Sequence, residues 1–531
     1  VLDTSVRPAS LATEACVDTG VSVDPAEAVA TAVAECRTPV DLHDLPGLGR
    51  LPLRGDGVPG AVPSGRLPGV YPEWLGGPGM ATAFGCRFPY VVGEMARGIA
   101  TARMVVAAVR HGFMGFFGSA GLAPDETQAA LQEIRAAVGA EAAWGANLIH
   151  SPDRPERERE IADLFIAEGV RHVSASAFMA LSPEVVRLAV SGLEEAGGEI
   201  RRRRHVLAKL SRPEVARAFL APPPTDMLRE LAAAGRIEAR QAEWASRLPV
   251  ASAITVEADS GGHTDNRPLS ALFPALAALR DEIAPAPVLL GAAGGLGTPE
   301  AVAAAFALGA EYVVTGSINQ SAVESGLAPE ARALLAEAGP ADVAMAPAAD
   351  MFERGVQVQV LARGTLFAPT ARRLYELWRT RTSFEALEPS ERDFVERRVL
   401  RRPFAEAWAE AHARLAARDP ARAARAEADP RQQLAIVFRT HLFHGAEWAR
   451  QGEIQRRGDW QIWCGPAMGA FNAWVAGSWL ADPAAREVGQ IGLNLLEGAA
   501  RITRAHQLRA LGVAVAPEHF RMPPRRLAVA P

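Results

Sequence analysis

The sequence predicts an α/β protein built on a (β/α)8 TIM barrel, with an inserted helical lid and a C-terminal helical subdomain. Between about residues 88 and 320, short apolar runs alternate with helical periods, a pattern typical of a parallel sheet whose strands are joined by helices. That span holds eight candidate strands, the number that a (β/α)8 barrel needs. After residue 320 the pattern is almost entirely helical. An open, doubly wound sheet is the competing topology.

Composition divides the chain into four predicted parts. Residues 1–80 are rich in Pro and Gly, which predicts a partly irregular N-terminal segment. Residues 81–325 carry the alternating pattern of the barrel, and residues 326–515 carry the helical pattern. Residues 516–531 form a Pro-rich tail that we expect to be loosely ordered.

The barrel prediction depends on eight apolar runs and the helical periods between them. The candidate strands are Phe88–Val92, Met114–Phe117, Ala143–Leu148, His172–Ser174, His205–Leu210, Ala253–Glu257, Val288–Gly291 and Tyr312–Thr315. The candidate helices are Thr101–Arg110, Asp125–Val138, Arg154–Glu168, Pro183–Ala196, Leu269–Ile283 and Pro299–Leu308. Between the fifth and sixth strands, residues 218–247 add an APPPT break and a helical run. We expect this insertion to form a helical hairpin over the top of the barrel, where insertions often become lids.

The segment of residues 288–317 carries the strongest functional signal. An apolar run leads into the turn Gly291–Gly297, Thr298 and Pro299 suit the start of a helix, and a second apolar run ends in Gly316-Ser317. This order predicts a βαβ unit with two glycine loops at one end. Such loops let backbone N–H groups approach an anion, and in a (β/α)8 barrel the loops after the last two strands form a phosphate site. An ordinary βα turn in which glycine only permits tight packing is an equally good interpretation.

Composition and motifs argue against several function classes. The chain has 56 basic and 61 acidic residues, a net charge of −5, which argues against a general nucleic-acid binder. Its four cysteines form no C-x-x-C pair, so no metal or redox site is predicted and a reduced, cytoplasmic compartment is expected. The sequence contains no P-loop motif, and its first thirty residues lack the pattern of a signal peptide.

One uncharged stretch, Ile462–Leu480, nearly reaches the length of a membrane span. It contains Pro466, Asn472 and several glycines, and its aromatic residues are spread along it rather than placed at its ends. We therefore expect no membrane span but a buried helix at a domain or subunit interface. This stretch is also the basis for expecting a possible homodimer.

A histidine follows the sixth strand, at the end where a barrel keeps its catalytic groups. His263 comes directly after Gly261 and Gly262. The glycines would let the backbone pass close to a flat ligand, and histidine can hold or deliver a proton near neutral pH. The alternative is a solvated loop histidine.

Other strand ends carry weaker signals. Gly93-Glu94-Met95 after the first strand suits a backbone that passes beside an aromatic ring system, although Met is more often core filler. Asn147 ends the third strand and could bond a phosphate or a carbonyl group. Lys209 ends the fifth strand, where it would need an anionic or carbonyl partner. Taken together, these residues suit a flavin mononucleotide with its phosphate on the last two loops and its ring across the barrel mouth.

Several motifs resemble the flavin-dependent nitronate monooxygenase and enoyl-reductase superfamily. They are GEMA at 93–96, GFFGSAGL at 115–122, WGANL at 144–148, EADSGGHTDN at 257–266, AAGGLGTPEA at 292–301 and VVTGS at 313–317. Within it, FPYVVGEMARGIA at 88–100, QIWCGPAMGAFNAWVAG at 461–477 and NLLEGAARITRAHQLR at 494–509 resemble the PfaD-type enoyl reductases, which are trans-acting subunits of polyunsaturated fatty acid and polyketide synthases. The resemblance covers roughly residues 67–515.

The resemblance implies a TIM barrel that holds FMN without a covalent bond. NADPH would reduce the flavin, and the substrate would be an enoyl thioester on an acyl carrier protein, with other synthase subunits as partners. His263 falls where the superfamily keeps its active-site histidine, and Lys209 is the other candidate for the catalytic proton donor. The implied cofactor-binding residues are Gly93, Glu94, Met95, Asn147, Lys209, Gly261, Gly262, Gly294, Gly295, Gly316 and Ser317.

Two other functions fit parts of the pattern. A nitronate monooxygenase shares the barrel and the flavin but uses the histidine as a base and dioxygen as oxidant; the C-terminal subdomain argues against it. A docking subunit that has kept the fold and lost its activity is the second, and the intact glycine loops and His263 argue against that.

Overall fold

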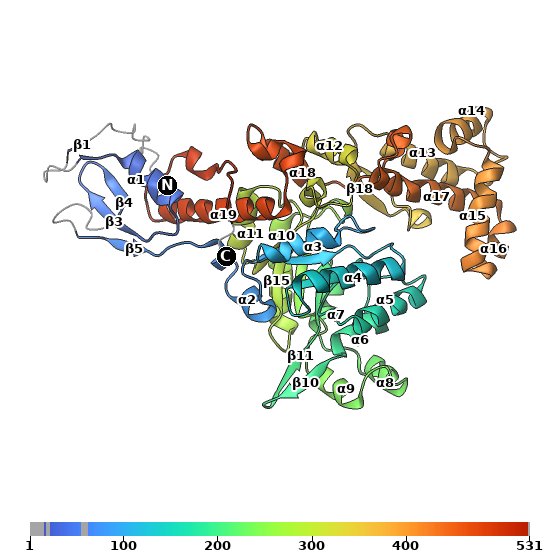
Figure 1. Cartoon of the computed structure of the whole chain (residues 1–531), viewed down its shortest axis with the longest axis horizontal. Coiled ribbons are helices and arrows are strands. Elements are labelled where there is room, and N and C mark those ends of the chain that lie inside the picture. The colour runs from blue at the N-terminus through green and yellow to red at the C-terminus, as the bar shows by residue number, and fades with distance from the viewer. Residues whose placement is uncertain (1–14, 17–21, 55–61, 529–531) are drawn as a thin grey trace, which may run out of the picture.

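The computed structural model describes residues 15–16, 22–54 and 62–528. At its centre, eight parallel strands close into a barrel (Figure 1). In chain order they are β6 (Tyr90–Val92), β7 (Met114–Phe117), β8 (Trp144–Ile149), β9 (His172–Ser176), β12 (His205–Leu210), β13 (Ala253–Glu257), β15 (Leu289–Ala293) and β16 (Tyr312–Thr315). The last strand pairs with the first, with Val313 opposite Tyr90. The predicted barrel is confirmed, and the open sheet is excluded.

Helices cover the outside of the barrel between the strands, as the periodicity predicted. They are α3 (Ala102–Arg110), α4 (Pro124–Val138), α5 (Pro155–Ala167), α6 (Pro183–Val190), α7 (Pro213–Leu220), α10 (Leu269–Ile283) and α11 (Pro299–Ala307). One predicted helix was too long, because α6 gives way to a hairpin of β10 (Leu193–Ala196) and β11 (Glu199–Arg202). Both residues of its turn, Gly197 and Gly198, have positive φ, a conformation that glycine adopts readily in hairpins.

The interior of the barrel is filled, and one end is closed. The apolar cluster inside combines strand residues such as Phe116 and Tyr312 with residues of α2 (Gly79–Phe84). Phe84 meets the ring of His172, at the start of β9, edge-on at a centroid distance of 5.4 Å. Because α2 closes the amino-terminal end, a ligand can approach the barrel core only at the carboxyl ends of the strands.

The insertion of residues 218–247 is helical, as predicted, but it does not cover the top of the barrel. Its helices α8 (Thr225–Ala233) and α9 (Ala239–Ala245) pack against α6 and β10 on the outer wall, toward the amino-terminal end (Figure 1). The reason is the direction of α7, which returns the chain from the carboxyl end of β12 and ends at Leu220, before α8 begins. The expectation of a lid over the mouth is corrected accordingly.

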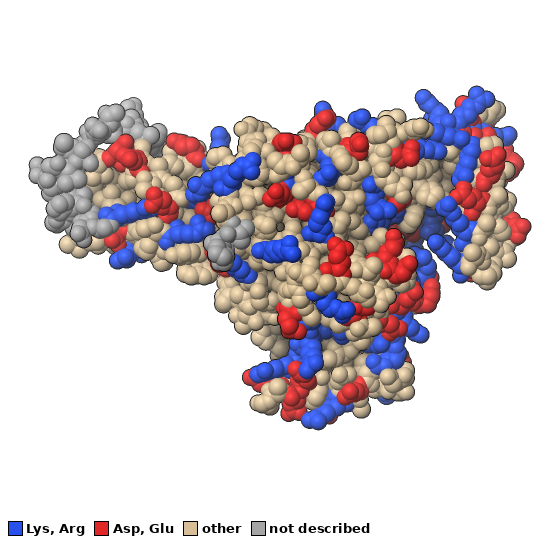
Figure 2. Space-filling view, viewed as in Figure 1, with Lys and Arg blue, Asp and Glu red and all other residues tan. Residues whose placement is uncertain are grey.

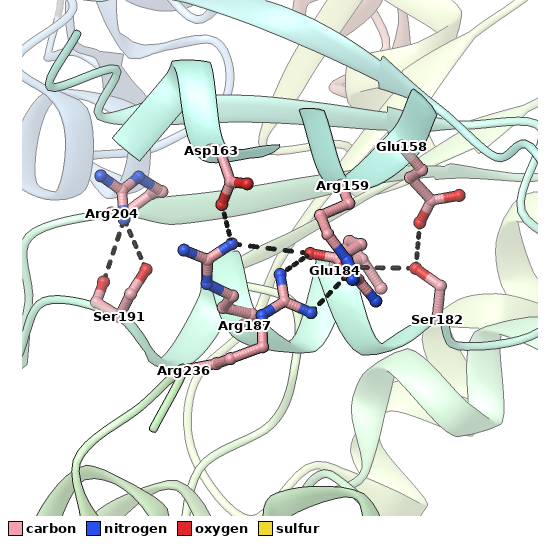
Figure 3. Close-up of polar contacts among 10 residues, drawn as sticks. Glu158, Arg159, Asp163, Ser182, Glu184, Arg187, Ser191, Arg204 and Arg236 are labelled. Atoms are coloured by element: carbon pink, nitrogen blue, oxygen red, sulfur yellow. Dashed lines mark hydrogen bonds and ion pairs between the residues drawn. The ribbon is translucent and has the colours of Figure 1, made fainter. Parts of the chain in front are cut away.

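A buried carboxylate holds this insertion to the barrel wall (Figure 3). Glu184, in the first turn of α6, has a side chain that is only 5% exposed, and both its oxygens accept hydrogen bonds of 2.6 Å from Arg236 in the turn between α8 and α9. Arg159 and Arg187 lie 3.5 and 3.7 Å from the same carboxylate. Such a bidentate, charge-assisted pair fixes both position and orientation.

The C-terminal part is mostly helical, as predicted, and also contains two strands that the sequence pattern did not predict. Its helices are α12 (Pro329–Ala336), α13 (Phe367–Thr380), α14 (Pro389–Asp393), a π-helix (Phe394–Leu400), α15 (Phe404–Arg418), α16 (Pro420–Glu427), α17 (Pro430–Gln451), α18 (Pro466–Val475) and α19 (Val488–Ala510). β17 (Val343–Pro347) pairs with β18 (Gln357–Leu361), and β18 pairs with the two-residue β14 (Gly262–His263) of the barrel. This sheet joins the C-terminal part to the barrel mouth.

The long helix α19 packs directly on the outside of the barrel. A Cβ atom at Gly492 would lie 2.6 Å from the ring of Phe113, and one at Gly498 would lie 2.6 Å from Pro299. Glycine within a helix costs about 1 kcal/mol relative to alanine, and the close packing that glycine permits here offsets that cost. α19 is thereby held firmly on the barrel, and the N-terminal segment and the C-terminal tail pack against it.

The N-terminal segment and the tail are more ordered than predicted. Helix α1 (Pro25–Ala34) and strands β3 (Val40–Leu45), β4 (Gly49–Leu53) and β5 (Gly65–Leu67) form a small unit beside α19. Arg504 of α19 is fully buried and donates a hydrogen bond of 3.1 Å to the carbonyl of Cys36. In the tail, the Arg525 N–H donates to the Asn494 side chain of α19 at 2.8 Å. The predictions for residues 1–14, 17–21, 55–61 and 529–531 lie outside the described residues.

The stretch Ile462–Leu480 lies largely buried between parts of the same chain. Of the two expected locations, a domain interface or a subunit interface, the structure shows the first. Most of it forms α18, which packs against α12 and the 3-10 helix η2 (Ser317–Ser321). Because its apolar residues are covered by the chain itself, the stretch no longer supports a homodimer. Within the described ranges, no helix has both the length and the apolar character that crossing a bilayer requires.

We expect Glu184→Ala to lower the free energy of unfolding by about 3 kcal/mol, because it removes the buried carboxylate that pairs with Arg236, whose side chain is only 19% exposed. Arg240→Ala is the matched control, since it removes an insertion ion pair with Glu195 whose side chains are 67% and 41% exposed; it should cost no more than about 1 kcal/mol. Urea denaturation of both variants measures the difference, and equal effects would contradict the role given to Glu184.

Candidate functional site

The loop after β13 joins the C-terminal part at the mouth of the barrel. Gly262 and His263 form β14, which pairs with β18. A Cβ atom at Gly261 would lie 2.8 Å from the backbone nitrogen of Cys464 and 2.8 Å from Oγ of Ser317. The residue must therefore be glycine for three chain segments to meet here. The sequence placed Gly261, His263 and Ser317 in one site, and the structure brings them together.

Lys209 projects from the end of β12 between two carboxylates. Its Nζ lies 3.0 Å from Glu257 at the end of β13 and 3.2 Å from Glu94 after β6. Burial disfavours the charged ammonium, but the charges and hydrogen bonds of Glu257 and Glu94 outweigh burial and raise the pKa of Lys209 above its usual range. Lys209 is therefore a fixed positive charge inside the mouth. The anionic partner that the sequence required for Lys209 is a pair of side chains of the same chain, of which Glu257 had not been predicted.

His263 is paired with an acidic residue from the C-terminal part. Its Nε2 lies 3.2 Å from Oδ1 of Asp350. Burial favours the neutral imidazole, but the hydrogen bond and the charge of Asp350 outweigh it, so the pKa of His263 is raised above its ordinary value. The same contact, working against burial, lowers the pKa of Asp350. The pair thus favours an imidazolium at the mouth.

Asp350 lies in a segment, residues 348–355, that we call the mouth strap. Arg439 of α17 donates a hydrogen bond of 3.0 Å to the carbonyl of Ala349 and lies 3.0 Å from Glu353. Arg354 of the strap pairs at 3.0 Å with Asp153 in the loop after β8. The strap is therefore anchored on both sides, which fixes Asp350 against the histidine. Sequence reasoning missed Asp350, because it lies 87 residues from His263 and follows no recognisable motif.

The two glycine loops after β15 and β16 differ in a way that the sequence could not show. A Cβ atom at Gly294 would lie 2.6 Å from the backbone of Ala258, so this glycine packs against the neighbouring loop. Gly295 and Gly316 face open space, with no atom within 4 Å of an added Cβ. In the described part of the chain, no residue accepts a hydrogen bond from the N–H groups of Gly295, Gly316 or Ser317. These donors form a cradle of the kind that an anion can occupy.

Other predicted site residues are engaged within the protein. The Asn147 side chain accepts a hydrogen bond of 3.1 Å from the Ala120 N–H and donates one of 2.8 Å to Ser176 Oγ, tying the loops after β7 and β9 together. Gly93 lies against β16, where a Cβ atom would be 2.8 Å from a valine methyl. Met95 is buried, with 8% exposure. All these residues lie at the predicted end of the barrel.

Basic and acidic side chains are interspersed over the described residues of the face shown in Figure 2. No broad basic expanse covers this face, in keeping with the balanced composition.

Two regions of the chain match known families. Residues 80–376 match the family described as nitronate monooxygenase, a span that includes the barrel, the mouth strap and β18. Residues 381–460 match the inserted helical domain of [acyl-carrier-protein] S-malonyltransferase, which here corresponds to the helices from α14 to α17.

Relatives resemble nearly the whole chain. A polyunsaturated fatty acid synthase protein of Thraustochytrium sp. is 40% identical over 499 residues, which cover 91% of this chain and 33% of that protein. Polyketide biosynthesis protein PksE of Bacillus subtilis is 38% identical over 434 residues, covering 81% of this chain and 56% of PksE. The chain thus spans about a third to just over half the length of these relatives.

Solved structures share the fold. The enoyl reductase domain of MlnA, from the macrolactin biosynthesis cluster of Bacillus amyloliquefaciens, is 34% identical with a TM-score of 0.78 and covers 82% of this chain and 99% of its own. A variant of FabK from Thermotoga maritima, 17% identical with a TM-score of 0.50, shows the fold alone. The chain therefore belongs to the nitronate monooxygenase family, in the branch of the PfaD-type enoyl reductases of polyunsaturated fatty acid and polyketide synthases.

Proposed function

We propose that the chain is an FMN-dependent, NADPH-linked enoyl reductase that acts in trans on enoyl thioesters carried by an acyl carrier protein of such a synthase. The observation that carries this proposal is the shared position of an open anion cradle and the His263–Asp350 pair at one end of the barrel. The similarity to the MlnA enoyl reductase domain and to the synthase proteins supports the choice of reaction. Carrier protein and synthase subunits are the proposed partners.

The residues present fit FMN. Gly295, Gly316 and Ser317 offer backbone N–H groups that no described residue uses, and a Cβ at either glycine would enter the space they leave. We assign the phosphate of FMN to this cradle. Gly294 supports the cradle by packing on the loop after β13. Gly93, Glu94, Met95, Asn147, Gly261 and Gly262 form the walls that we place beside the ring.

Held by the cradle of Gly295, Gly316 and Ser317, FMN would supply hydride transfer from NADPH to the β-carbon of the enoyl thioester. The α-carbon would then need a proton, and we assign its delivery to His263. Asp350 engages Nε2, so Nδ1 is the ring nitrogen left to hold the mobile proton. Asp350 acts by keeping the imidazole charged and oriented. Lys209 has its pKa raised by its two carboxylates, so it retains its proton; we assign it an electrostatic role in the site.

The function is tested by the visible spectrum of the purified protein. We expect flavin absorption bands that bleach when NADPH is added without oxygen and return when crotonyl-carrier protein is added. Bands that return only with oxygen or with a nitronate would overturn the proposal in favour of a monooxygenase. Absence of flavin bands after reconstitution with FMN would exclude both enzymes.

The cradle is tested at Gly316, because nothing lies within 4 Å of an added Cβ there and a side chain would meet no atom of the protein. Gly316→Asp should weaken FMN binding by on the order of a hundredfold, because it sets a carboxylate against the phosphate. Gly316→Asn is the control of equal size and should bind FMN much more tightly than the aspartate variant. Equal affinities of the two variants would refute the assignment.

The role of Asp350 is tested by the pH profile of kcat. The imidazolium form of His263 is the proton donor, so kcat falls as pH rises through the pKa of His263. Because Asp350 raises that pKa, Asp350→Asn should move this fall to lower pH while FMN remains bound. His263→Ala should retain FMN, lose most of the turnover and show no such limb. An unshifted profile in Asp350→Asn would remove Asp350 from the mechanism.

A further inference from the structure

Arg97 is a buried cation at the mouth for which the reaction described above has no use. It lies in the loop between β6 and α3, three residues after Glu94, and is only 9% exposed. Its guanidinium carbon lies 3.6 Å from the ring centroid of Phe443 in α17. Among the described residues, none lies within ion-pair distance of the guanidinium and none accepts a hydrogen bond from it.

The neighbouring charged groups do not compensate Arg97. The carboxylates whose charges act on it are Glu447 and Asp350. Glu447 is already paired with Arg450 at 2.6 Å, and Asp350 with His263 at 3.2 Å. Burial lowers the pKa of Arg97 to about 10, so it is still charged near neutral pH. The guanidinium nitrogens are not among the buried polar atoms that lack a partner, so they reach solvent, where an anionic ligand can pair with them.

The backbone at Arg97 also departs from what its residue type prefers. Arg97 has a φ of +60°, and the following Gly98 has a φ of +67°. The N–H of Arg97 is held by a hydrogen bond of 2.7 Å to the carbonyl of Ala120, in the loop after β7. Glycine would adopt this left-handed conformation without strain, whereas arginine does so at a cost. Strain of this kind at the rim of a site points to a use for the side chain.

We propose that Arg97 binds a phosphate group of a reactant that enters the mouth beside His263. A guanidinium presents paired donors that match a phosphate, and here they are left free. Resting on the proposed function, two reactants carry such a group: the carrier protein, on the phosphodiester of its phosphopantetheine arm, and NADPH. The FMN phosphate is assigned to the cradle of Gly295 and Gly316.

The test compares Arg97→Met and Arg97→Lys with the wild type as full-length, FMN-loaded proteins. Arg240→Met is the control, because Arg240 is an exposed arginine of the insertion, away from the mouth. KM is measured for crotonyl-carrier protein, for NADPH and for the crotonyl thioester of N-acetylcysteamine, which has no phosphate. Arg97→Met should raise one of the first two KM values on the order of tenfold. It should leave the KM of the short thioester and the FMN content unchanged, and the lysine variant should lie between.

The KM that rises identifies the source of the phosphate. A higher KM for crotonyl-carrier protein assigns it to the phosphopantetheine arm, and a higher KM for NADPH assigns it to the dinucleotide. Unchanged KM values for both, or an equal rise for the short thioester, would overturn the proposal. Calorimetric titration with phosphopantetheine, pantetheine and NADP+ tests Arg97 even if the protein reduces no enoyl thioester. In that case Arg97→Met should weaken the binding of phosphopantetheine or of NADP+ and leave the binding of pantetheine unchanged. If each of the three ligands binds wild type and variant equally well, the proposal is overturned.

Discussion

Close backbone contact between the barrel and the C-terminal part is the constraint on which the site depends. A Cβ atom at Gly297 would lie 2.1 Å from the carbonyl oxygen of Ala467, and one at Gly465 would lie 2.9 Å from the nitrogen of Gly261. Close-packed interiors accept an added atom only by moving their neighbours. The second contact lies in the loop after β13, directly before β14, and it therefore helps to fix where His263 lies.

The cations of the mouth differ in how fully their charge is balanced. Lys209 lies between Glu94 and Glu257, so it keeps its charge and that charge is neutralised by two carboxylates. The Asp350 carboxylate lies 3.2 Å from His263 and raises the pKa of its imidazole against the effect of burial. Arg97 lies over the face of the Phe443 ring and has no carboxylate within ion-pair distance among the described residues. The three cations thus differ in the number of carboxylates beside them, and this difference is the basis for the different role proposed for each.

Much of the barrel could be predicted from the sequence, because strand and helix periods are local properties. The positions of His263 and of both glycine loops followed from the same reasoning. Asp350 could not be found, since its pairing with His263 depends on how the C-terminal part folds over the mouth. Nor could the sequence separate Gly294, which packs on a neighbouring loop, from Gly316, which faces open space, because that difference lies in the surroundings. The insertion lies toward the amino-terminal end of the barrel because of the direction of α7, and the local sequence pattern does not predict that direction.

The pairing of β14 with β18 ties the reacting end of the barrel to a strand from outside it. A fragment cut at residue 325 would retain all eight barrel strands and both glycine loops but would lose β18, the mouth strap and Asp350. Such a fragment could still bind an anion, yet nothing would hold its histidine charged or in place. Transplanting the chemistry of this protein into another scaffold therefore means moving the barrel together with its C-terminal half, since neither piece is a portable catalyst.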